Sequence, residues 1–447
     1  MTVAPGTKLF GTDGVRGAAG VFLTAELAFA LGRAAVLVCD APSPQVLVVR
    51  DTRASGEMLE TALCAGIAGA GGQALLGGVL PTPAASILTK RYGFDLAAVI
   101  SASHNPHTDN GIKFFDAAGR KLPDEAEAAL AGHVQAPSQE ARRDRPLYGR
   151  VRPLAGTLED YIRELASRFP LSLDGMRVAL DCANGATHRA APLLFERLGA
   201  AVDAVAVQPD GININEACGS THPEALAEHL RRGGHEIGFA FDGDGDRVLA
   251  AAHDGSVIDG DEIIAHVALD LERRGELGGG VAVTTMTNYG FHNAMRDAAI
   301  EVATTDVGDR YVVEELERRG WLIGGEQSGH IVDMRLTPSG DGIAAALLLL
   351  QALDGRPLEP GTAMTKLPQL LVNVPVTQRE ALEGCAAVWD AVETEQAALE
   401  GRGRVLVRPS GTEPLVRVMV EAPAEEECRE VAQRLVAVVR QELGGGA

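Results

Sequence analysis

The sequence predicts an α/β protein with three similar α/β units of mixed, mostly parallel sheets, followed by a C-terminal α+β domain, around a central cleft. Two observations lead to this prediction. Up to about residue 366, short apolar runs alternate with helical patterns, and each unit ends in a polar, glycine-containing loop. Beyond that point, two strand patterns follow each other with no helix between them, which is typical of an antiparallel sheet.

The composition fits a large enzyme. The 447 residues, 46% of them hydrophobic, suffice for three or four domains with substantial cores. The net charge is −21, from 61 acidic and 40 basic residues. This balance argues against binding to nucleic acids or anionic membranes, because both need a basic face. It leaves room for an anionic small molecule, which a few local arginines can hold.

Three features predict a cytoplasmic protein. The longest apolar run, Ile343–Leu350, is far too short to span a bilayer. Met1–Gly20 lacks the basic-then-apolar order of a signal peptide. The six cysteines are scattered without paired spacing, which is typical of reduced thiols.

The first unit is expected to end in the linker Gln135–Pro153, which lacks apolar periodicity. Ser55 is the expected N-cap of its second helix. The elements expected in this unit are helices over Thr24–Val38, Ser55–Gly69 and the residues after Pro83, and strands over Val46–Val49, Ala74–Leu76 and Leu96–Ile100. The strand and helix order indicates parallel pairing with right-handed crossovers.

The same sequence patterns predict the strands and helices of the later units. The second is expected to have strands over Val178–Leu180, Val202–Val207 and Ile237–Phe241, with helices over Ala190–Leu198 and Glu224–Arg231. The third is expected to have strands over Val281–Thr284, Glu301–Thr304 and Leu322–Gly324, closed by a helix over Gly342–Ala352. The last is expected to have strands over Leu370–Val376, Arg404–Val407 and Leu415–Glu421, with helices over Ala381–Leu399 and Glu425–Leu443. The predicted domains are residues 1–150, 151–252, 253–366 and 367–447.

The stretch Val99–Pro106 carries the first candidate for chemistry. Ser103 follows an apolar strand and is expected on a turn at its end, where a serine can be exposed and can act as a nucleophile or carry a covalent group. The sequence Asp109–Gly111 favours a tight turn that folds Lys113 back towards this serine. A lysine there can carry a proton if burial or nearby cations lower its pKa. The alternatives are a capping serine and a solvated lysine.

Three aspartates at alternate positions, Asp242, Asp244 and Asp246, follow another apolar strand and are separated by glycines. In such a loop the carboxylates can converge, and because they repel one another they need a cation. Hard oxygen ligands select Mg²⁺ or Ca²⁺. An EF-hand is excluded, since its sixth and twelfth positions would be Arg247 and His253 instead of Gly and Glu. A solvated acidic turn is the alternative.

Two further loops suit a phosphorylated sugar. In Gly325–His330, Glu326 and Ser328 can hydrogen-bond sugar hydroxyls, and His330 can titrate near neutral pH. Near the C-terminus a strand is followed by a phosphate-type loop, in which guanidinium forks, hydroxyls and a glycine amide can bind phosphate oxygens. The phosphate-binding residues expected there are Arg408, Ser410, Gly411, Thr412 and Arg417. A capped turn with a surface arginine is the alternative.

Together these motifs resemble those of the α-D-phosphohexomutases, in order and over essentially the whole chain. The matching segments are Phe10–Gly17, Ser101–Pro106, Asp242–Arg247, Gly325–His330 and Arg408–Pro414. Two features resemble the branch of this family that acts on glucosamine phosphates. They are Gln327 and the opening segment Phe-Gly-Thr-Asp-Gly-Val-Arg-Gly.

The resemblance implies a role for each motif. Ser103 would be a phosphoserine that gives and receives the phosphoryl group, and its phosphate would contact a Mg²⁺ ion. The implied metal ligands are Asp242, Asp244 and Asp246, together with Ser103. Arg16 and Arg247 would steady the transferring phosphoryl group, and Lys113 and His330 are the acid/base candidates. The implied sugar-binding residues are Glu326, Ser328, Gly308 and Arg310, and the phosphate-type loop would hold the phosphate that does not react.

The resemblance also implies the reaction, an isomerisation between glucosamine 6-phosphate and glucosamine 1-phosphate through glucosamine 1,6-bisphosphate, which also acts as activator. The product would feed the synthesis of UDP-N-acetylglucosamine and cell-wall precursors. An activating kinase or self-phosphorylation would prime the serine, and a homodimer stays open. The alternatives are a mutase for glucose or mannose phosphates, an aspartyl-phosphate phosphatase and a Ca²⁺-binding scaffold.

Overall fold

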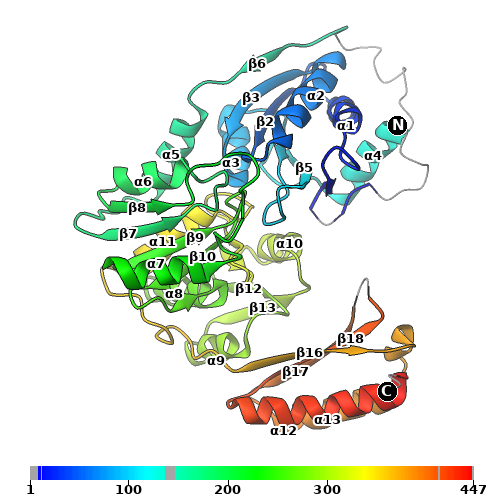
Figure 1. The fold of residues 1–447 in the computed structure, drawn as a ribbon, viewed down its shortest axis with the longest axis vertical. Coiled ribbons are helices and arrows are strands. Elements are labelled where there is room, and N and C mark those ends of the chain that lie inside the picture. The colour runs from blue at the N-terminus through cyan, green and yellow to red at the C-terminus, as the bar shows by residue number, and fades with distance from the viewer. Residues whose placement is uncertain (1–8, 12, 136–145, 411–412, 445–447) are drawn as a thin grey trace. The chain divides into compact units, whose positions relative to one another are not determined.

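The structure is a computed structural model that describes residues 9–11, 13–135, 146–410 and 413–444. The chain packs as two compact units (Figure 1). The first unit comprises residues 1–286 and 302–360, and the second comprises residues 287–301 and 361–447.

The first sheet of the first unit has the order β1-β5-β4-β2-β3-β6. Its strands are β1 (Val15–Ala18), β2 (Gln45–Arg50), β3 (Gln73–Val79), β4 (Leu96–Ile100), β5 (Asp109–Asp116) and β6 (Val151–Pro153). The strands β4, β2, β3 and β6 pair in parallel, whereas β5 is antiparallel to both of its neighbours. The accompanying helices are α1 (Ala25–Leu37), α2 (Ser55–Gly69), α3 (Thr82–Tyr92), α4 (Asp124–Gln135) and α5 (Thr157–Arg168).

Two further sheets complete the first unit. The second has the order β11-β10-β9-β7-β8 and the third the order β13-β12-β14-β15. The strands of the second are β7 (Arg177–Asp181), β8 (Ala201–Val205), β9 (Ile237–Phe241), β10 (Val248–Ala252) and β11 (Val257–Ile258), with helices α6 (Ala190–Arg197) and α7 (Pro223–Gly233). The strands of the third are β12 (Gly280–Thr284), β13 (Glu301–Thr305), β14 (Ile323–Gly325) and β15 (Ile331–Asp333), with helices α8 (Gly260–Arg273), α10 (Asp309–Arg319) and α11 (Gly342–Leu353).

Four strands of each sheet share one spatial order: β3-β2-β4-β5, β8-β7-β9-β10 and β13-β12-β14-β15. In each sheet the last two strands form an antiparallel hairpin. The strands that begin the first two hairpins, β4 and β9, are buried along their whole length, which explains their uninterrupted apolar sequences. The hairpin loops contain Ser103, Asp242–Arg247 and Glu326–His330. The three loops with predicted chemistry therefore occupy equivalent positions in a repeated topology.

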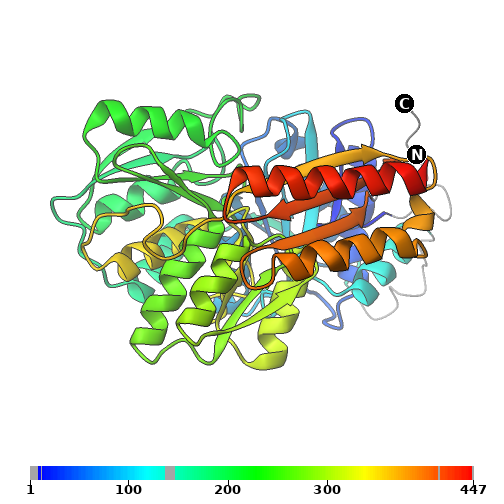
Figure 2. The ribbon, with the colours of Figure 1, turned by 90° about the horizontal axis from the view of Figure 1, so that it is seen from below.

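The second unit contains the antiparallel sheet β16-β18-β17, with strands β16 (Gln369–Pro375), β17 (Arg404–Pro409) and β18 (Leu415–Glu421). Helices α12 (Ala386–Ala398) and α13 (Glu425–Leu443) lie side by side on one face of this sheet (Figures 1 and 2). Helix α9 (Tyr289–Asp297) belongs to the same unit, because the backbone amide of Tyr289 donates to the buried Glu421 over 2.9 Å. The predicted α/β and α+β fold classes are confirmed.

Three local predictions were wrong. Ser55 is not an N-cap, since Ala54 occupies that position without a side-chain bond and the Ser55 hydroxyl accepts from Asn110 instead. Asp109–Gly111 forms no turn but begins β5, and residues 101–108 make the connection. Lys113 nevertheless lies opposite Val99 on β4, as the hairpin requires. The predicted helix over 381–399 is a 3₁₀ turn at Arg379–Leu382 followed by α12.

Among the described residues, no helix is both long enough and apolar enough to cross a lipid bilayer. The boundaries predicted at residues 150, 252 and 366 stay predictions.

Candidate active site

The serine loop and the aspartate loop meet in the first unit. Ser103 Oγ donates to Asp242 Oδ2 over 2.5 Å, although 139 residues separate the two in sequence. Both side chains are buried. The loops touch closely because residue 243 is glycine: a Cβ there would lie 2.5 Å from the Ser103 carbonyl oxygen. The structure therefore brings together the two motifs on which the sequence analysis depended most.

Ser103 has a backbone φ of +50°, in the left-handed region that costs a non-glycine residue conformational energy. The buried side chain of Arg53 holds this loop, donating to the carbonyl oxygens of Ser103 and Asn105, both over 2.8 Å. It also donates to the carbonyl oxygens of Pro106 and Asp109. Arg53 pairs in turn with the buried Asp51 over 2.8 Å. The strained serine is thus fixed by a buried ion pair.

The three aspartates converge, as predicted. One oxygen atom from each of Asp242, Asp244 and Asp246 lies within 4.8 Å of the others, and all three residues are buried. Burial and the neighbouring Asp246 and Asp244 raise the pKa of Asp242 well above its usual value. The pKa of Asp244 is lowered, because Lys113 and the hydroxyl of Thr82 outweigh the effect of burial.

Lys113 is the cation of this cluster. Its Nζ lies 2.7 Å from Asp244 and 3.7 Å from Asp246. Burial alone would lower the pKa of Lys113, but Asp13, Asp244 and Asp246 raise it above its usual value. The lowered lysine pKa considered from the sequence is therefore not found, and Lys113 is a protonated donor in this arrangement.

The donor set fits a hard divalent cation. Asp244 Oδ1 and Asp246 Oδ1 are buried and have no hydrogen-bond partner. A buried carboxylate oxygen without a partner is costly, and a metal ion would satisfy both. Carboxylate oxygens are the ligands of Mg²⁺ and Ca²⁺, so the triad could bind either ion.

Two arginines flank the serine. Arg247 NH1 lies 3.2 Å from Nδ1 of His104, and Arg16 NH1 donates to Asn105 over 3.4 Å. Both guanidinium groups have a buried Nε without a hydrogen-bond partner. Arg16 is further held by Asp13 over 2.6 Å. Unsatisfied guanidinium donors beside a buried serine suit the oxygen atoms of a phosphoryl group.

His330 completes the cluster from the third hairpin loop. Its Nδ1 lies 3.6 Å from Asp246 and its Nε2 lies 3.5 Å from Asp309. Burial acts to lower the pKa of His330, but Asp246 and Asp309 raise it above its usual value. Lys113 and His330 thus approach Asp246 from different hairpins, within reach of one site.

The predicted sugar-binding residues are only partly brought together. Glu326 Oε1 accepts from the backbone amide of Gly308 over 3.1 Å, so these two residues are in direct contact. Ser328 is exposed on the same loop. Arg310 instead forms ion pairs with Asp124 and Glu127 at the start of α4.

The phosphate-type loop lies in the second unit. Arg408 on β17 is directly opposite Arg417 on β18, and Arg417 Nε is buried without a hydrogen-bond partner. The hydroxyl of Ser410 accepts from the amide of Glu413 over 3.2 Å. Gly411 and Thr412 lie outside the described residues. Arg379 NH1 donates to the carbonyl oxygen of Ser410 over 2.9 Å, a contact that the sequence analysis missed.

Sequence reasoning also missed a chain of ion pairs beside the serine–aspartate cluster. Lys121 Nζ lies 2.7 Å from Asp13 and 2.6 Å from Asp309, and so connects two segments far apart in sequence. Asp13 in turn contacts Lys113 over 3.8 Å. Each of these residues occurs in a glycine-containing polar loop near a motif, which is the one local signal they carry.

Comparison with known proteins agrees with this geometry. Four family models described as phosphoglucomutase/phosphomannomutase match: alpha/beta/alpha domain I over residues 7–141, domain II over 159–255, domain III over 259–371 and the C-terminal domain over 371–438. A protein named phosphoglucosamine mutase from Moorella thermoacetica is 51% identical over 433 residues, covering 95% of this chain and 97% of its own length.

Two solved structures share the fold. A phosphoglucomutase/phosphomannomutase family protein from Burkholderia thailandensis has a TM-score of 0.81 at 22% identity, covering 98% of both chains. Aspergillus fumigatus N-acetylphosphoglucosamine mutase, solved with GlcNAc-6P and magnesium, has a TM-score of 0.69 at 20% identity, covering 97% of this chain and 96% of its own.

Proposed function

The chain belongs to the phosphoglucomutase/phosphomannomutase family, and from this premise we propose that it interconverts glucosamine 6-phosphate and glucosamine 1-phosphate. The observation that carries the proposal is the buried Ser103 hydroxyl, hydrogen-bonded to Asp242 between two flanking arginines. The choice of glucosamine rests on the Moorella relative, whose name states that specificity.

In the proposed reaction, phosphorylated Ser103 donates its phosphoryl group to the free hydroxyl of the sugar phosphate. The bond from phosphorus to Oγ breaks and Oγ takes up a proton, a bond from phosphorus to the sugar oxygen forms, and the hydroxyl proton of the sugar passes to a base. The resulting glucosamine 1,6-bisphosphate turns over and returns its other phosphoryl group to the serine. Lys113 and His330 would exchange these protons, and their contacts with Asp246 support this role.

The aspartates Asp242, Asp244 and Asp246 would hold Mg²⁺, using the two buried carboxylate oxygens that have no hydrogen-bond partner. When bound, the ion would neutralise charge on the transferring phosphoryl group. Arg16 and Arg247 supply the remaining positive charge from the protein.

The remaining predicted residues would recognise the substrate. Glu326 and Gly308, joined by a hydrogen bond, would contact the sugar with the exposed Ser328. The paired Arg408 and Arg417 would hold the phosphate that is not transferred. Arg310 is the weakest of these assignments, because its guanidinium is engaged by α4. Gly411 and Thr412 keep their proposed phosphate role from the sequence alone.

We also propose priming of Ser103 by a kinase or by self-phosphorylation, and a cytoplasmic location, which the six free cysteines support. A homodimer stays a prediction.

The test combines an assay with a mass measurement. Purified protein primed with glucosamine 1,6-bisphosphate should convert glucosamine 6-phosphate, and tryptic mass spectrometry should find phosphate on Ser103. Ser103→Ala should lose at least about 10⁴-fold in rate, since the covalent carrier is gone. Ser43→Ala is the matched control, because the hydrogen bonds of this serine are to the Gly71 carbonyl oxygen and from the Gln73 side chain, and neither residue belongs to the proposed site. Full activity in Ser103→Ala, or phosphate on an aspartate, would reject the proposal, and faster turnover of glucose or mannose phosphates would reject its specificity.

A further inference from the structure

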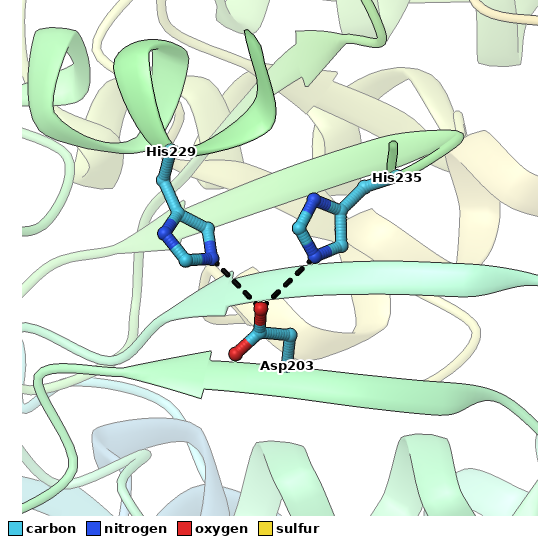
Figure 3. Close-up of side chains that lie close together, drawn as sticks. All are labelled: Asp203, His229 and His235. Carbon is cyan, nitrogen blue, oxygen red and sulfur yellow. Dashed lines mark hydrogen bonds and ion pairs between the residues drawn. The ribbon is translucent and has the colours of Figure 1, made fainter. Parts of the chain in front are cut away.

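A second cluster of possible ligands lies away from the serine site, on the second sheet of the first unit. It combines Asp203 from the edge strand β8, His229 from α7 and His235 from the connection to β9 (Figure 3). Nε2 of each histidine lies 3.0 Å from the same atom, Asp203 Oδ2. The three ligand atoms all lie within 4.8 Å of one another. Two imidazole nitrogens and one carboxylate oxygen thus converge on one point.

The local backbone fixes the two rings in place. Helix α7 ends at Gly234, whose φ of +64° turns the chain back beneath the helix. The rings of His229 and His235 then stack, with centroids 5.1 Å apart and planes at 30°. Gly233 makes room for this arrangement, because a Cβ there would lie 2.1 Å from Cε1 of His235. The donors are therefore arranged before any ligand binds.

The environment leaves these donors available. The side chain of His235 is 1% exposed, but those of His229 and Asp203 are 31% and 48% exposed, so the cluster is open to solvent on one side. Partial burial acts to raise the pKa of Asp203, yet the hydrogen bonds from both histidines lower it below its usual value. The carboxylate is therefore an anion at neutral pH. Within the described residues, His235 Nδ1 has no hydrogen-bond partner, so the ring is oriented through its Nε2 contact.

We propose that Asp203, His229 and His235 bind a divalent transition-metal ion of the zinc class. Two imidazole nitrogens and a carboxylate oxygen are a common set for Zn²⁺, Co²⁺ and Ni²⁺, whereas Mg²⁺ and Ca²⁺ prefer oxygen alone. Ligands of a tetrahedral zinc lie about 3.3 Å apart, so the two 3.0 Å separations between Nε2 and Asp203 Oδ2 need to open by only a few tenths of an ångström, and the two nitrogens lie within 4.8 Å of each other. Water on the exposed side would complete the coordination.

Such an ion would connect an edge strand to a helix and to the turn that follows the helix. It would stabilise the folded second sheet without touching the phosphoryl-transfer residues. The chain would then carry two metal sites of different chemistry, an all-oxygen triad for a hard cation and a nitrogen-rich site for a softer one. The net charge of −21 favours the accumulation of cations near both sites.

The experiment uses the full chain, cleared of metal and then kept in several millimolar Mg²⁺, so that the aspartate triad is occupied. Zn²⁺ binding is measured by titration calorimetry, and Co²⁺ binding by the visible absorption of the bound ion. Each titration should show one ion bound per chain in addition to the Mg²⁺ at the aspartate triad. His229→Ala and Asp203→Asn should each weaken binding at least about tenfold, because each removes a ligand. His222→Ala is the matched control, since this exposed histidine lies 3.2 Å from one carboxylate, Glu224, and lies outside the cluster.

All three variants should keep the mutase rate and the circular dichroism of the parent protein. Zn²⁺ should also raise the melting temperature of the parent and of His222→Ala, but not that of the two ligand variants. Two results would overturn the proposal. One is undiminished Zn²⁺ binding in both ligand variants. The other is that excess Mg²⁺ displaces all of the Zn²⁺ and Co²⁺ bound to the parent protein.

Discussion

The serine–aspartate cluster of the first unit and the phosphate-type loop of the second solve different electrostatic problems. In the cluster, charges are buried and neutralise one another, with Lys113 bridging Asp244 and Asp246. In the loop, Arg417 is about a third exposed, and its nearest carboxylate, Glu413, is 3.9 Å away. A buried, paired cluster is suited to stabilising charge that develops during reaction, whereas open arginines are suited to capturing an anion from water.

This contrast predicts how variants divide between turnover and binding. Changes in the buried cluster should mainly reduce kcat, because they act on groups that are proposed to contact the transferring phosphoryl group. Changes in the open loop should mainly raise KM.

Within the aspartate triad, Asp244→Asn should have a large effect. It removes one charge from the triad and leaves Lys113 and Thr82 facing a neutral amide. We expect kcat to fall by about 10³-fold or more, with a smaller change in KM. Steady-state kinetics at saturating Mg²⁺ measures this, with Asp254→Asn, an exposed aspartate outside the triad, as control. A variant in which only KM changes would contradict the assignment of Asp244 to the reacting centre.

Chelation is the chemical counterpart of this substitution. Removing divalent cations with EDTA should reduce turnover to a comparable extent, and added Mg²⁺ should restore it, if the two partnerless carboxylate oxygens hold the ion. Full activity after exhaustive chelation, verified by elemental analysis, would exclude a metal-dependent step.

Arg53→Met tests whether the serine loop depends on its buried support. The change leaves the buried Asp51 without its ion-pair partner and removes the donor to the Ser103 carbonyl oxygen. We expect about 3 kcal/mol of lost unfolding free energy, because an unpaired buried charge remains. Arg53→Met with Asp51→Leu should regain part of that stability but not the turnover, since the loop stays unsupported. Urea denaturation and kcat, measured on both variants, separate these effects.

The strands, the helices and the motifs of the candidate site were predictable because their signals are local. Buried strands such as Leu96–Ile100 are continuous apolar runs, and the aspartate triplet needs only three positions and two glycines. Ser103 and Asp242 could be joined in advance because the motifs, taken together, resemble those of the α-D-phosphohexomutases; neither motif alone connects them. The hairpin that contains Lys113 was predicted correctly, but from an incorrect position of its turn. Asp109–Gly111 belongs to the strand, and the connection precedes it.

What could not be predicted depends on contacts between distant segments. Lys121 becomes part of the site only because folding places it between Asp13 and Asp309. Arg53 has no local feature that distinguishes it from a surface arginine until its carbonyl partners are known. The same holds for Asp203 and His229, which no spacing rule connects. Arg310 shows the reverse case, where a motif position is engaged by α4 instead of facing the sugar loop.

Arg417→Ala should affect substrate capture more than turnover. It removes the guanidinium group that lies opposite Arg408. The buried Nε of Arg417 has no hydrogen-bond partner. We expect kcat/KM to fall about 30-fold, mostly through KM. Arg417→Lys should recover only part of this loss, because lysine keeps the charge but not the planar fork. Arg440→Ala, near the end of α13, is the control. An equal loss in kcat would erase the distinction between the two regions.

The smallest predicted effect is a loss of unfolding free energy at acidic pH, which can be compared between the two units. Each contains a partly buried histidine, His266 on α8 and His292 on α9, and burial lowers the pKa of both to about 4. In the unfolded chain each titrates near 6.5, so above that pH both states are neutral and stability is unaffected. As the pH falls from 6.5 towards 4, the unfolded state binds protons first, and stability is lost through that window. We expect about 1–2 kcal/mol per histidine at pH 5, after allowance for solvent screening. His266→Gln and His292→Gln should each lose correspondingly less unfolding free energy than the parent between pH 7 and pH 5, as measured by urea denaturation. If neither substitution flattens this pH dependence, the acid sensitivity of both units must come from carboxylates, and the buried clusters would be the first place to look.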